Sequence, residues 1–133
     1  MGSNPSAKLF YGMWFSETPQ EVMDYCKLHK LGRNNDYFVT DHLHGIDPEL
    51  DFPTRKRLRE DRNVACSWIG YEAEEFVISG VMLLRYDWGT SKIDLRFPES
   101  GDVDAEIREA AMKLGIPDWK DREISWFLHA NYS

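Results

Sequence analysis

The segment Asp41-His42-Leu43-His44-Gly45-Ile46-Asp47 holds the residue types best suited to chemistry. If the segment is a strand, His42 and His44 point to the same face, because side chains two residues apart in a strand lie on one side. Neutral imidazoles bind zinc, iron or nickel, and the carboxylate of Asp47 could add an oxygen ligand. A catalytic zinc site needs three protein ligands, and no third one follows at a diagnostic spacing. We therefore expect no cofactor, and the alternative is a small metal-dependent enzyme that holds a divalent metal at His42, His44 and Asp47.

Nucleophilic catalysis has little support in the sequence. The two cysteines, Cys26 and Cys66, are too few for a disulfide framework. Both lie among apolar residues, which predicts buried free thiols. The chain also lacks a phosphate-binding glycine loop and a nucleophile elbow. No catalytic residue is assigned, and a protein without enzymatic activity is the favoured interpretation.

Acidic residues suggest a binding surface instead. The net charge of the 133 residues is -7, and residues 63–133 hold 7 Lys+Arg against 13 Asp+Glu. An acidic surface attracts a partner with a basic surface. We therefore expect a small acidic protein that binds and inhibits or neutralises another macromolecule, as an immunity protein, an antitoxin or a phage-encoded inhibitor does. The residues expected to contact this protein partner are one exposed aromatic and six acids: Glu72, Glu74, Glu75, Trp88, Glu99, Asp102 and Asp104.

The run Arg55-Lys56-Arg57-Leu58-Arg59 is the one basic segment. The acids Glu60 and Asp61 follow it directly and weaken its field, so a solvated helix is favoured over a nucleic-acid contact. No apolar stretch approaches the roughly 20 residues that a membrane span needs. No signal peptide is visible either, so we expect a cytoplasmic protein without a membrane or nucleic-acid partner.

The elements that position these residues follow from periodicity and from turn signals. Thr18 and Glu21 predict a capping box with Pro19 at the first helical position. Gly80 marks a β-bulge or a close approach within a strand. Asp102 and the acids after it favour the first turn of a second long helix. The expected strands are 9–15, 37–44, 64–71, 76–86, 92–97 and 123–129, and the expected helices are 18–32, a short basic one at 54–62, and 104–114.

This order predicts one α+β domain over residues 1–133, with a flexible leader at residues 1–7. The sheet is expected to be largely antiparallel, with five to six strands and two helices on one face. The order β-α-β-β-β-β-α-β contains the elements of a ferredoxin-like unit with additional strands.

Overall fold

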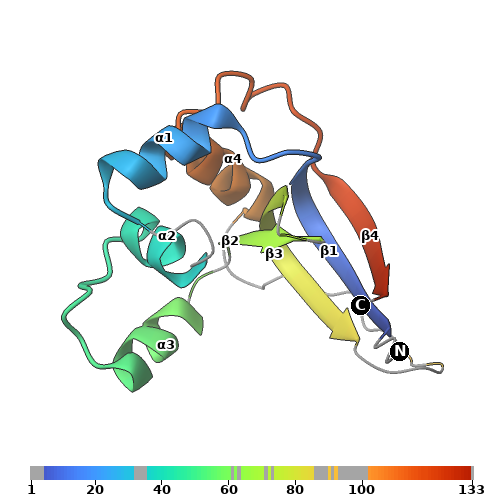
Figure 1. Ribbon diagram of the computed structural model, residues 1–133, viewed down its shortest axis with the longest axis horizontal. Coiled ribbons are helices and arrows are strands. Elements are labelled where there is room, and N and C mark those ends of the chain that lie inside the picture. Colours follow the sequence, from blue (N-terminus) through green and yellow to red (C-terminus); the bar gives the residue numbers. More distant parts are fainter. Residues whose placement is uncertain are drawn as a thin grey trace.

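The chain folds into one antiparallel sheet and four helices among the residues that the structure describes. The structure is a computed structural model, and it describes residues 5–31, 36–60, 62, 64–70, 72, 74–85, 90, 92 and 102–132. The α+β class is as predicted (Figure 1). In chain order the elements are β1 (Pro5–Phe15), α1 (Gln20–Leu28), α2 (Asp36–Leu43), α3 (Phe52–Glu60), β2 (Ala65–Ile69), β3 (Glu75–Arg85), α4 (Val103–Lys113) and β4 (Ser125–Tyr132).

The sheet has the strand order β2-β3-β1-β4, and each neighbouring pair is antiparallel. With the three helices between β1 and β2 counted as one connection, the element order is that of a βαββαβ unit. The prediction of five to six strands and two helices is therefore wrong for the described residues, which form four strands and four helices. The strand expected at 92–97 lies outside the described residues, except for Lys92.

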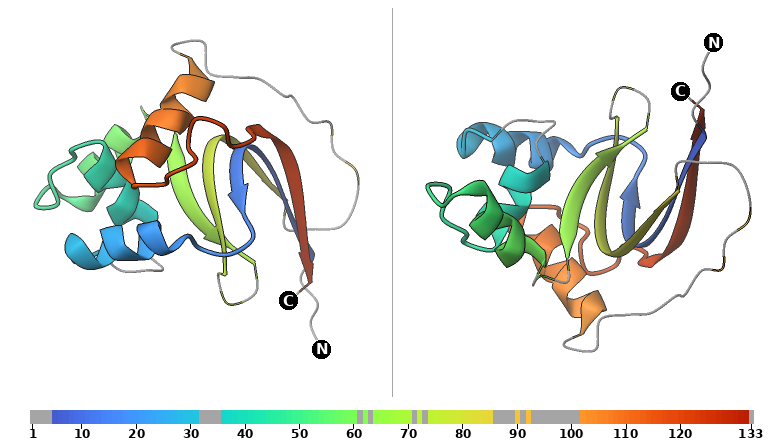
Figure 2. Two further views of the ribbon diagram at one scale, coloured as in Figure 1. Left: turned by 90° about the horizontal axis from the view of Figure 1, so that it is seen from above. Right: turned by 90° about the horizontal axis from the view of Figure 1, so that it is seen from below.

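The helices lie on one side of the sheet and enclose the main core (Figure 2). Met13 and Phe15 of β1 face the helices with Phe76 and Ile78 of β3, and all four are at most 3% exposed. Each such side chain contributes roughly 1.5–3 kcal/mol through burial. The helices supply Val22, Cys26, Val39, Leu43, Val103, Ile107, Ala110 and Ala111 to the same cluster. Both cysteines are buried and free, as predicted.

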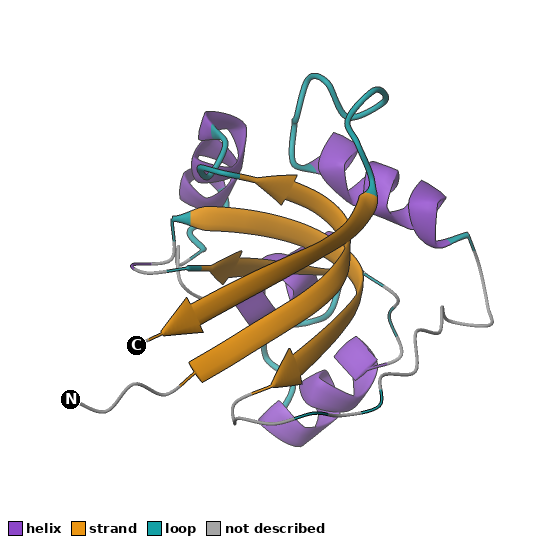
Figure 3. Cartoon of the chain, turned by 90° about the vertical axis from the view of Figure 1, so that its right-hand side faces the viewer, coloured by secondary structure: helices purple, strands orange, loops and turns teal. Residues whose placement is uncertain are grey.

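A β-bulge interrupts the pairing of the two central strands. Tyr11 pairs with Val81 and Gly12 with Ser79, so Gly80 is the extra residue on β3, as predicted. A Cβ atom added at Gly12 would lie 2.0 Å from the carbonyl oxygen of Ile78, so this position excludes any larger residue. The strands curve together along their length (Figure 3), as a bulge promotes.

The strand predicted at 37–44 is wrong, because this segment forms α2. Val39 and Leu43 are both buried in the main core, and their spacing of four residues places them on one helical face. The aromatic and β-branched residues of the segment favour a strand locally. Packing of the segment as a helix against the core overrides this local preference.

Two predicted ends also need correction. β1 begins at Pro5, so the last three residues of the predicted leader belong to the strand, where Ala7 pairs with both Arg85 and Ala130. The predicted capping box of α1 is absent, since the N-cap is Pro19 and no side chain caps the helix.

Thr18 joins the start of α1 to the β2–β3 hairpin instead of capping the helix. Its backbone N–H and its hydroxyl both donate to the carbonyl oxygen of Glu74, at 3.0 and 3.2 Å. The indole N–H of Trp68 donates to the same hydroxyl at 3.0 Å. By contrast, Asp102 caps α4 as expected, and its carboxylate accepts a hydrogen bond from the N–H of Ala105 at 3.2 Å.

Helix α2 covers the outer edge of β2. The backbone N–H of Cys66 donates to the hydroxyl of Thr40 at 3.2 Å, and both groups are buried. Within the described part of the chain, no helix is long and apolar enough to cross a membrane.

Candidate functional site

The structure separates the three residues predicted to bind a metal. Because the segment is helical, His42 and His44 point in different directions. His42 is exposed and shares a hydrogen bond between its Nδ1 and the hydroxyl of Tyr25. His44 is half-buried and donates from Nε2 to the carbonyl oxygen of Val64 at 3.2 Å. The carboxylate of Asp47 accepts from the N–H of Glu49 at 2.9 Å in an exposed loop.

A group of three or more His, Cys, Asp or Glu residues that could hold a metal ion does not occur among the described residues. The prediction of a metal site at His42, His44 and Asp47 assumed that the two histidines share one face of a strand. This premise is wrong, because the segment up to Leu43 forms helix α2.

The predicted acidic residues fall into two separate groups. Glu72 and Glu74 are exposed at the β2–β3 hairpin, and the carboxylate of Glu75 accepts from the indole N–H of Trp14 at 2.7 Å. Glu75 also lies 3.5 Å from Nδ1 of His129. At the other group, Asp102 caps α4 and Asp104 accepts from the hydroxyl of Tyr11 at 2.8 Å. Trp88 and Glu99 lie outside the described residues.

The two acidic groups contact opposite faces of the sheet. Tyr11 and Trp14 are three residues apart in β1, so their side chains lie on opposite sides. Tyr11 packs against the main core under the helices. Trp14 instead packs on Phe127, with ring centroids 6.1 Å apart, next to a smaller cluster around Phe10. Burial raises the pKa of Tyr11, and its hydrogen bond to Asp104 raises this pKa further.

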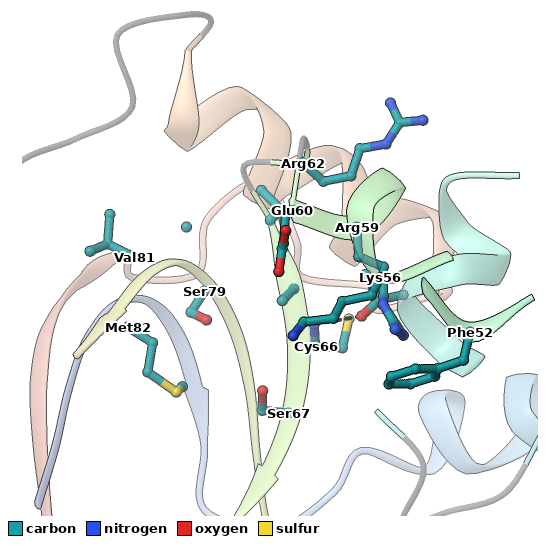
Figure 4. A pocket seen from close by; sticks show the side chains of 14 residues that line it. Phe52, Lys56, Arg59, Glu60, Arg62, Cys66, Ser67, Ser79, Val81 and Met82 are labelled. Atoms are coloured by element: carbon teal, nitrogen blue, oxygen red, sulfur yellow. Dashed lines mark hydrogen bonds between the residues drawn. The ribbon is translucent and has the colours of Figure 1, made fainter. Parts of the chain in front are cut away.

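A cavity of about 530 Å³, here called the α3 cavity, lies between α3 and the strands β2 and β3. This volume is within the range of roughly 300–1,000 Å³ that is typical of small-molecule sites. Figure 4 shows Lys56 and Glu60 extending from α3 toward the strands, whereas Arg62 points outward. The polar and aromatic residues that line the cavity are Thr40, Phe52, Lys56, Arg59, Glu60, Arg62, Ser67 and Ser79.

The cavity lies where β3 extends past the first residue of β2. β2 begins at Ala65, which pairs with Ser79, so β3 continues beyond the bulge without β2 beside it. The residues that line this end of the cavity are consecutive in β3 and run from Ser79 to Met82. Val81 pairs with Tyr11 on the helix-facing side of the sheet, whereas Met82 pairs with Phe10 on the opposite side.

An ion pair between α2 and α3 holds Arg59, one of the cations that line the α3 cavity, in position. The carboxylate of Asp41 lies 3.7 Å from Nε of Arg59, and Asp41 is only 3% exposed. Neither oxygen of Asp41 accepts a hydrogen bond from the described residues. Burial raises the pKa of Asp41, and the nearby charges of Arg59 and Arg55 oppose this change. The guanidinium of Arg59 also lies 5.6 Å from the ring centre of Phe52.

The α3 cavity could have been found from helical spacing within the basic run. Phe52, Lys56 and Arg59 occupy positions i, i+4 and i+7, so they share one face of α3. The sequence predicted a solvated helix here, and α3 has no buried residue. The serines of the cavity gave no comparable signal in the sequence. Ser67 lies within β2 and Ser79 within β3, and no local pattern marks either of them.

A second cavity of about 240 Å³ contains His44. The described residues that line it include two cations and two carboxylates: Arg62, Lys113, Glu106 and Glu109. Nζ of Lys113 lies 3.3 Å from the carboxylate of Glu109 and donates to the carbonyl oxygen of Leu43 at 3.4 Å. This smaller cavity therefore offers an external ligand less uncompensated charge than the α3 cavity does.

No family model, no curated protein and no solved structure matches the chain.

Removal of Arg59 should destabilise the fold strongly. Arg59→Ala leaves the buried carboxylate of Asp41 without its ion-pair partner, which should cost about 3–5 kcal/mol of unfolding free energy. Asp41→Asn removes the charge itself and should cost less. The double variant should therefore be more stable than Arg59→Ala alone, as measured by urea unfolding. Additive effects of the two substitutions would contradict this account.

Stability should fall in acid because of His42. Partial desolvation of the otherwise exposed His42 ring lowers its pKa below 6.5, and the neighbouring His29 lowers it further. The unfolded chain then binds more protons than the folded chain as the pH falls through 6.5. The free energy of unfolding should decrease from about pH 7 downward and level off below the folded pKa.

Urea unfolding of the unsubstituted chain and of His42→Gln at several pH values tests this effect. The contribution of Asp41 is common to both proteins and cancels in their difference. The variant should lose the part of the pH dependence that begins near 6.5. Two parallel pH profiles would exclude His42 as its source.

Proposed function

We propose that the protein binds a small phosphate-bearing ligand in the α3 cavity and performs no chemistry of its own. The observation that carries this proposal is the gathering of cations and hydroxyl groups around one cavity in a chain of net charge -7. Ammonium and guanidinium groups form charge-assisted hydrogen bonds with phosphate oxygens, and hydroxyl groups complete such sites.

The individual side chains support a specific arrangement of the ligand. Lys56 extends from α3 toward β2 (Figure 4), and Ser67 of β2 lines the same cavity, so a phosphate there could contact both groups. Arg59 is held by Asp41 beside this position. Phe52 is 56% exposed at the same wall, and its ring offers a surface for the apolar part of the ligand.

Among the described residues that line the cavity, Glu60 is the single carboxylate. Its negative charge disfavours an anion in the cavity. Removal of this charge therefore tests whether the preferred ligand is an anion.

The test is a calorimetric titration of inorganic pyrophosphate into the full chain at low ionic strength. Lys56→Gln should weaken binding about tenfold or more, because it removes a hydrogen bond to a charged group. Glu60→Gln should strengthen binding, because it removes the opposing charge. Affinity should also fall as the salt concentration rises.

Arg57→Gln is the matched control, because Arg57 is an exposed cation of α3 that does not line the cavity. It should change the affinity much less than Lys56→Gln does. Equal losses in both variants would indicate nonspecific attraction to α3 and would overturn the site. Absence of pyrophosphate binding would overturn the proposal as well.

Inhibition of a basic macromolecule is the second candidate function. The exposure of Glu72 and Glu74 at the β2–β3 hairpin favours it. The other described acids of the predicted surface are engaged within the fold, since Glu75 binds Trp14 and Asp102 caps α4. A basic partner would therefore meet the hairpin rather than a continuous acidic face.

Charge reversal distinguishes the two acidic groups. Glu72→Lys with Glu74→Lys should abolish capture of a basic partner from the source cell without a change in the unfolding free energy. Asp102→Lys should lower stability by about 0.5–2 kcal/mol through loss of the N-cap, and should leave capture intact. Capture that survives the hairpin reversal would exclude this candidate.

A further inference from the structure

Two histidines from different helices meet on the surface formed by α1 and α2. His29 follows α1 as its C-cap residue, and His42 belongs to the last turn of α2. Their ring centroids are 4.1 Å apart, and both side chains are exposed. Tyr25 completes the group, with its ring centroid 4.4 Å from that of His29. None of these residues lines the α3 cavity, so this group is independent of the proposed function.

The separation of the rings is close to that of two imidazoles on one metal ion. With metal–nitrogen distances of about 2.0–2.1 Å and tetrahedral geometry, two such rings have centroids roughly 5 Å apart. The observed separation of 4.1 Å therefore has to increase by only about 1 Å. Rotation of exposed side chains provides such a movement without a change in the backbone.

The hydrogen bond of Tyr25 leaves a coordinating atom available on His42. The Tyr25 hydroxyl contacts Nδ1 of His42, and a hydroxyl can accept as well as donate. When Nδ1–H donates to this hydroxyl, Nε2 carries the lone pair that a metal needs. Histidine ligands are commonly oriented by such a hydrogen bond from the second ring nitrogen.

We infer that His29 and His42 form a surface site for a divalent transition-metal ion of the zinc class, with Tyr25 as the residue that orients His42. Imidazole nitrogen is a preferred ligand of zinc, nickel and copper. Water molecules complete the coordination, because the described residues bring no third His, Cys, Asp or Glu ligand to the pair. The site replaces the predicted pairing of His42 with His44 by a pairing across two helices.

The experiment is calorimetric titration of Zn²⁺ into the full chain, free of any affinity tag and kept reduced with a non-chelating reductant. The unsubstituted chain should bind one Zn²⁺ ion at this pair. His29→Gln and His42→Gln should each weaken that binding at least tenfold, because either change leaves a single imidazole. Tyr25→Phe should weaken it about tenfold, as loss of an orienting hydrogen bond does.

His44→Gln and His129→Gln are the matched controls, since both residues lie outside the pair. They should retain the affinity of the unsubstituted chain. Circular dichroism should show that all variants are folded, which is expected because His29 and His42 are exposed. Zinc binding that is absent, or that persists in either His29→Gln or His42→Gln, would overturn the site.

Discussion

The two central strands approach each other at Gly12 more closely than a side chain would permit. The carbonyl oxygen of Ile78 occupies the space where a Cβ would stand. The pairing then continues past the bulge, so Val81 pairs with Tyr11 and Leu83 with Leu9. The extra residue shifts by one which residues of β3 face each side of the sheet, and such a bulge also promotes curvature of the strands. The residues of β3 around this bulge, from Ser79 to Met82, also line the α3 cavity.

Elements with a single consistent pattern could be predicted from the sequence. α4 combines an acidic cap with four apolar residues at helical spacing, and its core side chains Ile107, Ala110 and Ala111 are buried as that spacing implies. β1 and β3 are continuous apolar runs, and Gly80 gave a correct position for the bulge. In each case local propensity, hydrophobic pattern and tertiary packing favour the same conformation.

The failures arise where two patterns compete. Residues 37–44 contain aromatic and β-branched residues typical of a strand, but Val39 and Leu43 also fit a helical face, and the core buries them as such. Thr18 is a suitable helix cap, but Trp68 and Glu74 engage its hydroxyl. Such outcomes depend on contacts between residues far apart in the chain, which no local pattern contains.

The candidate sites were predictable only in part, for the same reason. The basic face of α3 is visible as Phe52, Lys56 and Arg59 at helical spacing, whereas its pairing with Ser67 and Ser79 requires the sheet register. The sequence pairs His42 with His44, whereas its neighbour in the structure is His29, which is 13 positions earlier in the chain and belongs to another helix. Only the packing of α1 on α2 brings these two rings together.

The hydrogen bond from the N–H of Cys66 to Thr40 has a consequence for association between chains. An edge strand with free backbone donors can recruit a strand from another molecule and start aggregation. At β2 the helix α2 already occupies this edge and uses one of its donors. A foreign strand could extend the sheet there only by displacing α2, and the buried side chains of Val39 and Leu43 would then be exposed. Helix α2, which the sequence did not predict, therefore protects this edge of the sheet from pairing with another chain.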